Sequence, residues 1–153
     1  AGNSRGLTAL SPQHYENKSM NAVTDLDTLI QNLEPRILSD TYVFCSLEDA
    51  DYGALSHTSP LASFAESEGL TLVLTRESAD EESLAYEGTF RCISLQVHSS
   101  LEAVGLTAAV TGELASEGIS ANVIAGYHHD HIFVPAHQAE TALHLLESIS
   151  SRR

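Results

Sequence analysis

The residues best suited to chemistry form the run His128-His129-Asp130-His131, in which three imidazoles surround one carboxylate. These side chains are common ligands of zinc and other transition metals. In an extended chain, neighbouring side chains point to opposite faces, so His129 and His131 can share a face that His128 does not easily reach. This geometry argues against a metal site. It favours a structural role in which ring nitrogens bond hairpin carbonyls, with a pH-sensitive surface as the remaining alternative, because imidazoles titrate near neutral pH.

The other candidate nucleophiles lack partners in the sequence. Cys45 and Cys92 lie in strand-like runs with no obvious histidine partner. We expect two free, half-buried thiols there, in preference to a disulfide or a catalytic thiolate. Serines are abundant, but no Gly-x-Ser-x-Gly run and no phosphate-binding loop occurs. We therefore expect no catalytic residue, no cofactor and no resident metal.

Composition limits the partners. The chain has 153 residues, 42% of them hydrophobic, which suffices for a packed core. Seven basic and 21 acidic residues give a net charge of −14, which repels phosphate backbones and anionic membrane surfaces. No apolar run approaches the roughly 20 residues that span a bilayer, and no secretory signal is visible. These features predict a cytoplasmic protein that binds neither nucleic acid nor membrane.

The first half of the chain shows mixed patterns. Residues 1–20 have no sustained period and resemble a tail or an expression remnant ahead of a start codon at Met20. The patterns beyond it predict a helix capped by Thr24 and ended by Pro35, an extended piece at 36–38, a turn near Asp40, a strand at 42–47, an acidic loop at 48–58, a helix from Ser59-Pro60 to Gly69, a strand at 70–75 and a charged connector at 76–82.

The second half is clearer, and the rest of the chain is expected to be organised around it. Residues 89–147 show strand, helix, strand, strand and helix patterns in succession. The expected elements are a strand at 90–98, a helix with Leu106, Val110 and Leu114 on one face that ends at Gly118, strands at 119–125 and 131–134, and a final helix that begins at Pro135.

A weak internal repeat links the two halves. A shift of 49 residues aligns Glu66–Thr71 with Ala115–Ser120, and Tyr42–Leu47 with Arg91–Gln96. Such short matches arise by duplication, shared architecture or chance. The repeat predicts a first, divergent unit at 21–84 and a second unit at 85–153. Two sheets of the same plan, each with two helices on one face, would follow.

The runs Ala108–Ile124 (AAVTGELASEGISANVI) and Tyr127–Pro135 (YHHDHIFVP) resemble ACT domains, the amino-acid-sensing modules of aspartokinases and related enzymes. They are most similar to a small bacterial family of stand-alone tandem ACT-like proteins. The match is good over 89–146 and weaker over 24–75. The resemblance implies an α+β, ferredoxin-like (βαββαβ) antiparallel sheet with helices on one face, two such units in tandem, and a homodimer paired through sheet edges.

The resemblance also implies an effector site between the loop after the first strand and the second strand of a neighbouring domain. A glycine at a helix start lets a ligand carboxylate reach free backbone N–H groups. The alternative is that Gly105 is only a tight turn and Asn122 only an exposed strand residue. The implied ligand-binding residues are Glu102, Val104, Gly105, Leu106 and Thr107 from the loop, and Asn122, Val123 and Ile124 from the strand.

Two departures from the ACT pattern bear on this site. The usual loop reads Asp-x-Pro-Gly, whereas here Glu102 stands near the acidic position and Val104 replaces proline. No final strand follows the last helix, so another segment has to fill that place in the sheet, and 36–38 is the candidate.

These features together predict a regulatory or sensor protein that binds a small amino acid or a related metabolite and is not a catalyst. The alternative is a protein–protein interaction module with a vestigial effector site. A third class, a ferredoxin-like enzyme using the histidine cluster, needs donors that converge around a cleft.

Overall fold

The computed structural model describes residues 25–152, so the predictions for residues 1–20 and for Thr24 lie outside the described residues. The elements are α1 (Leu26–Gln31), β1 (Pro35–Leu47), a 3₁₀ turn η3 (Ser56–Thr58), β2 (Ala62–Glu66), β3 (Gly69–Thr75), α2 (Arg76–Glu81), β4 (Phe90–Leu95), α3 (Leu106–Ser116), β5 (Asn122–Ala125), β6 (Asp130–Pro135), a 3₁₀ turn η4 (Ala136–Gln138) and α4 (Ala139–Ser151).

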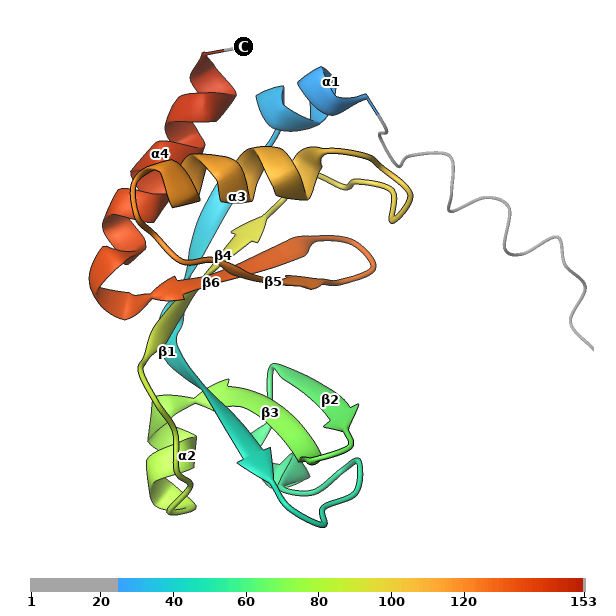
Figure 1. Ribbon diagram of the computed structural model, residues 1–153, viewed down its shortest axis with the longest axis vertical. Coiled ribbons are helices and arrows are strands. Elements are labelled where there is room, and N and C mark those ends of the chain that lie inside the picture. The colour runs from blue at the N-terminus through green and yellow to red at the C-terminus, as the bar shows by residue number, and fades with distance from the viewer. Residues whose placement is uncertain (1–24, 153) are drawn as a thin grey trace, which may run out of the picture.

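All six strands form one antiparallel sheet in the order β2-β3-β1-β4-β6-β5 (Figure 1). The expectation of two separate sheets was therefore wrong. The long strand β1 joins the halves, because its end pairs with β3 and its start pairs with β4. Pro35–Ile37 lies beside β4 and fills the position that no strand after α4 fills, in line with the prediction for residues 36–38.

Each half of the molecule has the ferredoxin-like strand order because the halves share two strands. In the C-terminal half, β4, α3, β5, β6 and α4 follow one another, and the start of β1 is the fourth strand. In the N-terminal half, β1, β2, β3 and α2 follow one another, and β4 is the fourth strand. The helix that this plan places between the first two strands is reduced to η3.

A register shift replaces the turn predicted near Asp40. Strand β1 continues through this region, and its pairing with β4 shifts between Ile37 and Thr41. The Arg91 guanidinium on β4 donates a hydrogen bond of 2.7 Å from Nη2 to the Leu38 carbonyl. An irregularity of this kind bends a strand without ending it, which explains why an interrupted pattern in the sequence belongs to one strand.

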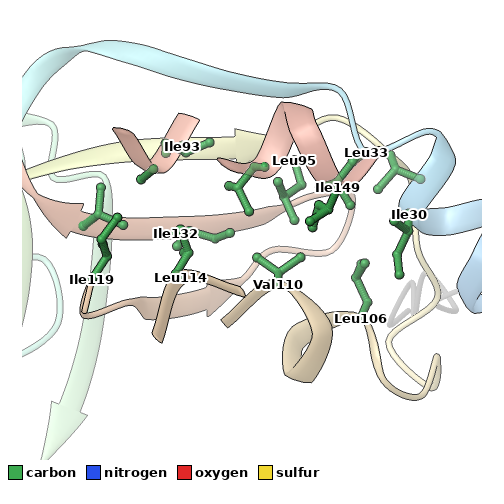
Figure 2. Close-up of a cluster of buried hydrophobic side chains, with 14 of the residues drawn as sticks. Ile30, Leu33, Ile93, Leu95, Leu106, Val110, Leu114, Ile119, Ile132 and Ile149 are labelled. Atoms are coloured by element: carbon green, nitrogen blue, oxygen red, sulfur yellow. The ribbon is translucent and has the colours of Figure 1, made fainter. Parts of the chain in front are cut away.

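The largest core lies between the sheet and helices α1, α3 and α4 (Figure 2). Leu106, Val110 and Leu114 line the inner face of α3 as predicted. A smaller core under α2 contains Val43 and Leu72. Tyr42 and Phe90 are paired on one face of the sheet, so Val43 on β1 and Ile93 on β4 point to the other face. Val43 belongs to the core under α2 and Ile93 to the main core, so both cores lie on that face. All four helices therefore cover the same face of the sheet.

The helix-free face is apolar as well. Aromatic side chains from three strands meet on it in edge-on pairs: Phe44 lies 5.3 Å from both Phe90 and Phe133, and Tyr42 lies 6.0 Å from Phe133, measured between ring centroids. Such edge-to-face pairs add to the stabilisation from burial. The rings come from three strands that are far apart in the sequence, so only the fold brings this aromatic cluster together.

The helix predicted from Ser59-Pro60 to Gly69 is a strand hairpin. Residues of β2 pair with β3 from Ala62 opposite Val73 to Glu66 opposite Gly69. Gly69 has φ +152°, and a Cβ there would lie 2.6 Å from the Leu47 carbonyl oxygen. Pairing with the apolar strand β3 outweighs the local helical pattern, which is a weak determinant in a short segment.

The charged connector predicted at 76–82 is helix α2. Thr75 caps it, because the Thr75 hydroxyl oxygen accepts a hydrogen bond of 3.1 Å from the Ser78 N–H. Helix α1 is capped in the same way by Asp25, which accepts from the Thr28 N–H at 3.0 Å. The repeat consequently fails at Glu66–Thr71, which is a hairpin, whereas Ala115–Ser120 joins a helix to a strand.

Candidate functional site

Helix α3 begins without a side-chain cap. Its N-cap residue is Gly105, with φ +96°, and no side chain accepts a hydrogen bond from the first turn. A Cβ at this position would lie 3.2 Å from Leu26 Cδ2. The positive φ therefore favours glycine here, and a larger residue would also have to displace the Leu26 side chain slightly. The backbone N–H groups of Leu106 and Thr107 have no carbonyl acceptor within the helix, so they can donate hydrogen bonds to a ligand.

The loop before α3 has polar and apolar exposed residues. Two hydrogen bonds to Ser100 hold the turn in this loop. The Ala103 N–H donates to the Ser100 carbonyl at 3.0 Å, and the Glu102 N–H donates to Ser100 Oγ at 3.1 Å. Glu102 is exposed. Leu101 and Val104 are 68% and 83% exposed. Val104, at the position where ACT loops have proline, thus adds apolar surface beside the open helix start.

The residues predicted from the second strand divide between the two faces of the sheet. Asn122 lies opposite Phe133, and Ile124 opposite His131, on the helix-free face. Val123 lies opposite Ile132 and packs against the main core. Helix α3 covers the other face, so one chain does not bring Asn122 to Gly105. A site that joins them across two copies stays a prediction.

Asn122 instead borders an open cavity of about 710 Å³ on the helix-free face. Sequence reasoning missed the other residues around it. The signal was present in the alternation of Phe44 and Ser46 along β1, but the partners come from distant segments that only the fold brings together. The lining residues are Phe44, Ser46, Ala85, Tyr86, Glu87, Phe90 and Asn122.

A second cavity, of about 550 Å³, lies between the loop after β1 and the turn between β2 and β3. Carboxylates dominate its lining: Glu48, Asp49, Asp51, Glu66 and Glu68. Within residues 25–152, no group of three or more His, Cys, Asp or Glu side chains has an arrangement that could hold a metal ion. The acidic residues of this loop are therefore near one another without forming a metal site.

The histidine run packs by its rings. His128 lies 5.4 Å from His98 and 5.1 Å from Tyr127 between ring centroids. His129 Nδ1 is buried and has no hydrogen-bond partner. No bond from these imidazoles to a hairpin carbonyl occurs in the described chain, so the predicted ring-to-carbonyl bonds are absent, and His128 contacts neighbouring rings instead. Burial raises the pKa of Asp130, and His131 and His129 partly oppose that rise.

Both thiols are free and buried. Burial raises the pKa of Cys92 to about 12 and also raises that of Cys45. A thiol is a nucleophile only as the thiolate, so neither side chain is equipped for thiol chemistry. The expectation of two free cysteines is confirmed, and they are more deeply buried than expected.

Two protein-family sequence models, both described as ACT domain, match the chain, one over residues 21–91 and the other over residues 87–148. A Vibrio cholerae protein of unknown function, named a possible transport protein and known from its crystal structure, is 46% identical to this chain in sequence. The likeness covers 82% of this chain and 95% of that one, with a TM-score of 0.75. The chain belongs to the ACT domain family. It contains two ACT-type domains in tandem, as the sequence predicted.

More distant structures share the ACT fold. An Agrobacterium tumefaciens protein is 18% identical over 76% of this chain and 87% of that chain, with a TM-score of 0.64. The ligand-free regulatory subunit of aspartate kinase from Thermus thermophilus is 12% identical over 75% and 95% of the two chains, with a TM-score of 0.55. No curated protein matches the sequence. Among the described residues of this ACT protein, no helix has both the length and the apolar character to cross a membrane.

Proposed function

We propose that this ACT protein binds a small metabolite, in the first place a free amino acid, at the start of α3, and that binding regulates a partner. Membership of the ACT family and the uncapped helix start at Gly105 support this proposal. An α-carboxylate would accept hydrogen bonds from the N–H groups of Leu106 and Thr107, where the helix dipole adds attraction. The exposed carboxylate of Glu102 is the natural partner for the α-ammonium group. Such a sensor would work in the cytoplasm, where free amino acids are abundant.

The proposed site is completed by a second copy of the chain. Within residues 25–152, strands β2 and β5 are the two edges of the sheet, and each pairs with a neighbouring strand on one side only. The exposed apolar side chains of Leu101 and Val104 flank the helix start and would be covered by a neighbour. A homodimer through a sheet edge would also bring Asn122 of one copy toward the α3 start of the other, which no single chain achieves.

The test is a thermal-shift screen with all common free amino acids, followed by titration calorimetry of any that raises the melting temperature. Replacing Thr107 by proline removes one N–H donor at a helix start, where proline is tolerated. Thr107→Pro is expected to weaken binding about tenfold, the loss of one charge-assisted hydrogen bond. Thr107→Ala is the matched control, because it keeps the N–H group and is expected to bind normally. A screen with no shift for any amino acid contradicts the proposal.

The second candidate function is a protein–protein interaction module. Two observations favour it: Leu26 occupies the space beside Gly105, and Phe64 on edge strand β2 is 70% exposed. Light scattering would show a dimer that is independent of amino acids, and Phe64→Lys would dissociate it, since charge on an edge strand opposes edge-to-edge pairing. Leu26→Ala, which widens the space, would leave amino-acid binding absent if the site is vestigial.

A further inference from the structure

The cavity on the helix-free face has aromatic walls that the proposed amino-acid site does not use. Phe44 of β1 and Phe90 of β4 are half-buried and pack edge-on, with 5.3 Å between ring centroids. Tyr86, also half-buried, comes from the connection after α2. Its hydroxyl donates a 2.7 Å hydrogen bond to Asp80 Oδ1 of α2, and its ring packs against the core under α2 on the other face of the sheet. The aromatic rings that border the space of about 710 Å³ are therefore those of Phe44 and Phe90.

The polar groups around this cavity include one negative charge. Ser46 contributes a hydroxyl and Asn122 an amide. The Glu87 carboxylate is exposed, and no lysine or arginine lines the cavity. Among residues 25–152, Glu87 takes part in no ion pair. The cavity thus combines aromatic rings with a carboxylate that has no basic partner.

We propose that this cavity binds a small organic cation whose ammonium nitrogen carries apolar substituents, such as a quaternary ammonium. The faces of aromatic rings attract cations, most strongly cations that are poorly hydrated. Glu87 supplies the opposite charge, and the apolar substituents contact the rings of Phe44 and Phe90. The net charge of −14 attracts cations to the molecule as a whole. A ligand with a free carboxylate meets Glu87 and is disfavoured, which separates this site from the one at α3.

The decisive comparison is between choline and its uncharged isostere 3,3-dimethylbutan-1-ol, each titrated into the full chain and followed by amide NMR. Choline is expected to bind saturably and to shift the amide signals of Ser46 and Asn122. The neutral isostere is expected to bind at least about tenfold more weakly, because it gains no charge–ring attraction. Equal affinities for the two compounds, or choline shifts that do not saturate, overturn the proposal.

Variants test the two components of the site separately. Glu87→Gln is expected to weaken choline binding about tenfold and to leave the fold intact, because the side chain is exposed. Glu147→Gln, at an exposed position of α4 on the helix-covered side of the sheet, removes the same charge outside the cavity lining and is expected to change affinity less than about twofold. Equal losses in the two variants would show general charge attraction and overturn the proposal.

Phe90→Leu keeps an apolar side chain and removes a ring. It is expected to weaken choline binding about tenfold without weakening the neutral isostere. Circular dichroism checks that the variant folds, and Phe44→Leu replaces it if it does not. Unchanged choline affinity in a folded ring-deleted variant contradicts the aromatic part of the site.

Discussion

The electrostatics of single residues depend on where the strands place them. Asp130 begins β6 in the hairpin that also contains the packed histidine rings. Burial raises the pKa of its carboxyl group above the ordinary 3.8, while His131 and His129 lower it to a smaller extent. The charged carboxylate is therefore less favourable in the folded than in the unfolded chain.

Asp130→Asn is accordingly expected to stabilise the protein at neutral pH. A carboxyl whose pKa is raised by folding favours the folded state while it is protonated, and that advantage is lost as pH rises through the folded-state pKa. The gain from Asp130→Asn should be present at pH 7 and vanish below about pH 4, where the acid is protonated in both states. Urea denaturation at the two pH values measures it, with exposed Asp51→Asn as control. A gain that persists at low pH would assign the effect to packing.

At this scale the sequence predicted the kinds of residue but not their partners. The free thiols follow from strand-like surroundings, and the glycine at 105 follows from its place before a helix. Leu26, which packs on Gly105, and Phe44 and Tyr86, which share a cavity with Asn122, come from segments far away in the sequence. Their proximity is a property of the fold, which local spacing does not encode.

Among the elements, α1 contributes more than its six residues suggest. Its Leu29 and Ile30 are buried in the main core with α3 and α4, and Leu26 packs on Gly105 at the start of α3. An isolated helix of this length is unstable in water. Tertiary packing therefore holds α1 in place, and α1 in turn forms one wall beside the proposed amino-acid site.

Leu29→Ala is expected to lower the free energy of unfolding by roughly 2–5 kcal/mol, because it leaves a cavity in a closely packed core. Tyr52→Ala, at a side chain that is 88% exposed, is the control and should change stability by less than about 0.5 kcal/mol. Urea midpoints of both variants measure the difference. A Leu29→Ala loss as small as the control would mean that α1 is not part of the stable core.

The elements of the second half were predictable because each of their patterns agrees with its surroundings in the fold. The helix with Leu106, Val110 and Leu114 buries that stripe, as its pattern predicts. The strand in residues 59–69 was not predictable in this way. Leu61, Phe64 and Ala65 fit a helical period as well as Ala62 and Phe64 fit a strand. Pairing with β3 decides between them, and that partner is not visible in the local pattern.

At the scale of the whole molecule, β1 and β4 belong to both ACT-type domains (Figure 1). The boundary predicted between residues 84 and 85 stays a prediction, but the pairing of Pro35–Ile37 with β4 makes the C-terminal sheet depend on the N-terminal half. The periodicity of the sequence indicates two similar units. The missing strand after the last helix predicts that residues 36–38 complete the C-terminal sheet, but nothing in the spacing indicates that β4 in turn completes the N-terminal one.

Because the two halves share strands, a destabilising substitution in one half is expected to increase unfolding of the other. Leu72, 2% exposed in the core under α2, has no contact with the core around α4. Leu72→Ala is nevertheless expected to accelerate hydrogen exchange of the slowest amides about 30-fold or more in α4 as well as in β3, because a loss of about 2 kcal/mol would lower the stability of one cooperative unit. Leu29→Ala should produce the reciprocal change in β3. Unchanged protection of α4 in Leu72→Ala would show that the halves open independently, and the shared strands would then be a feature of topology without thermodynamic coupling.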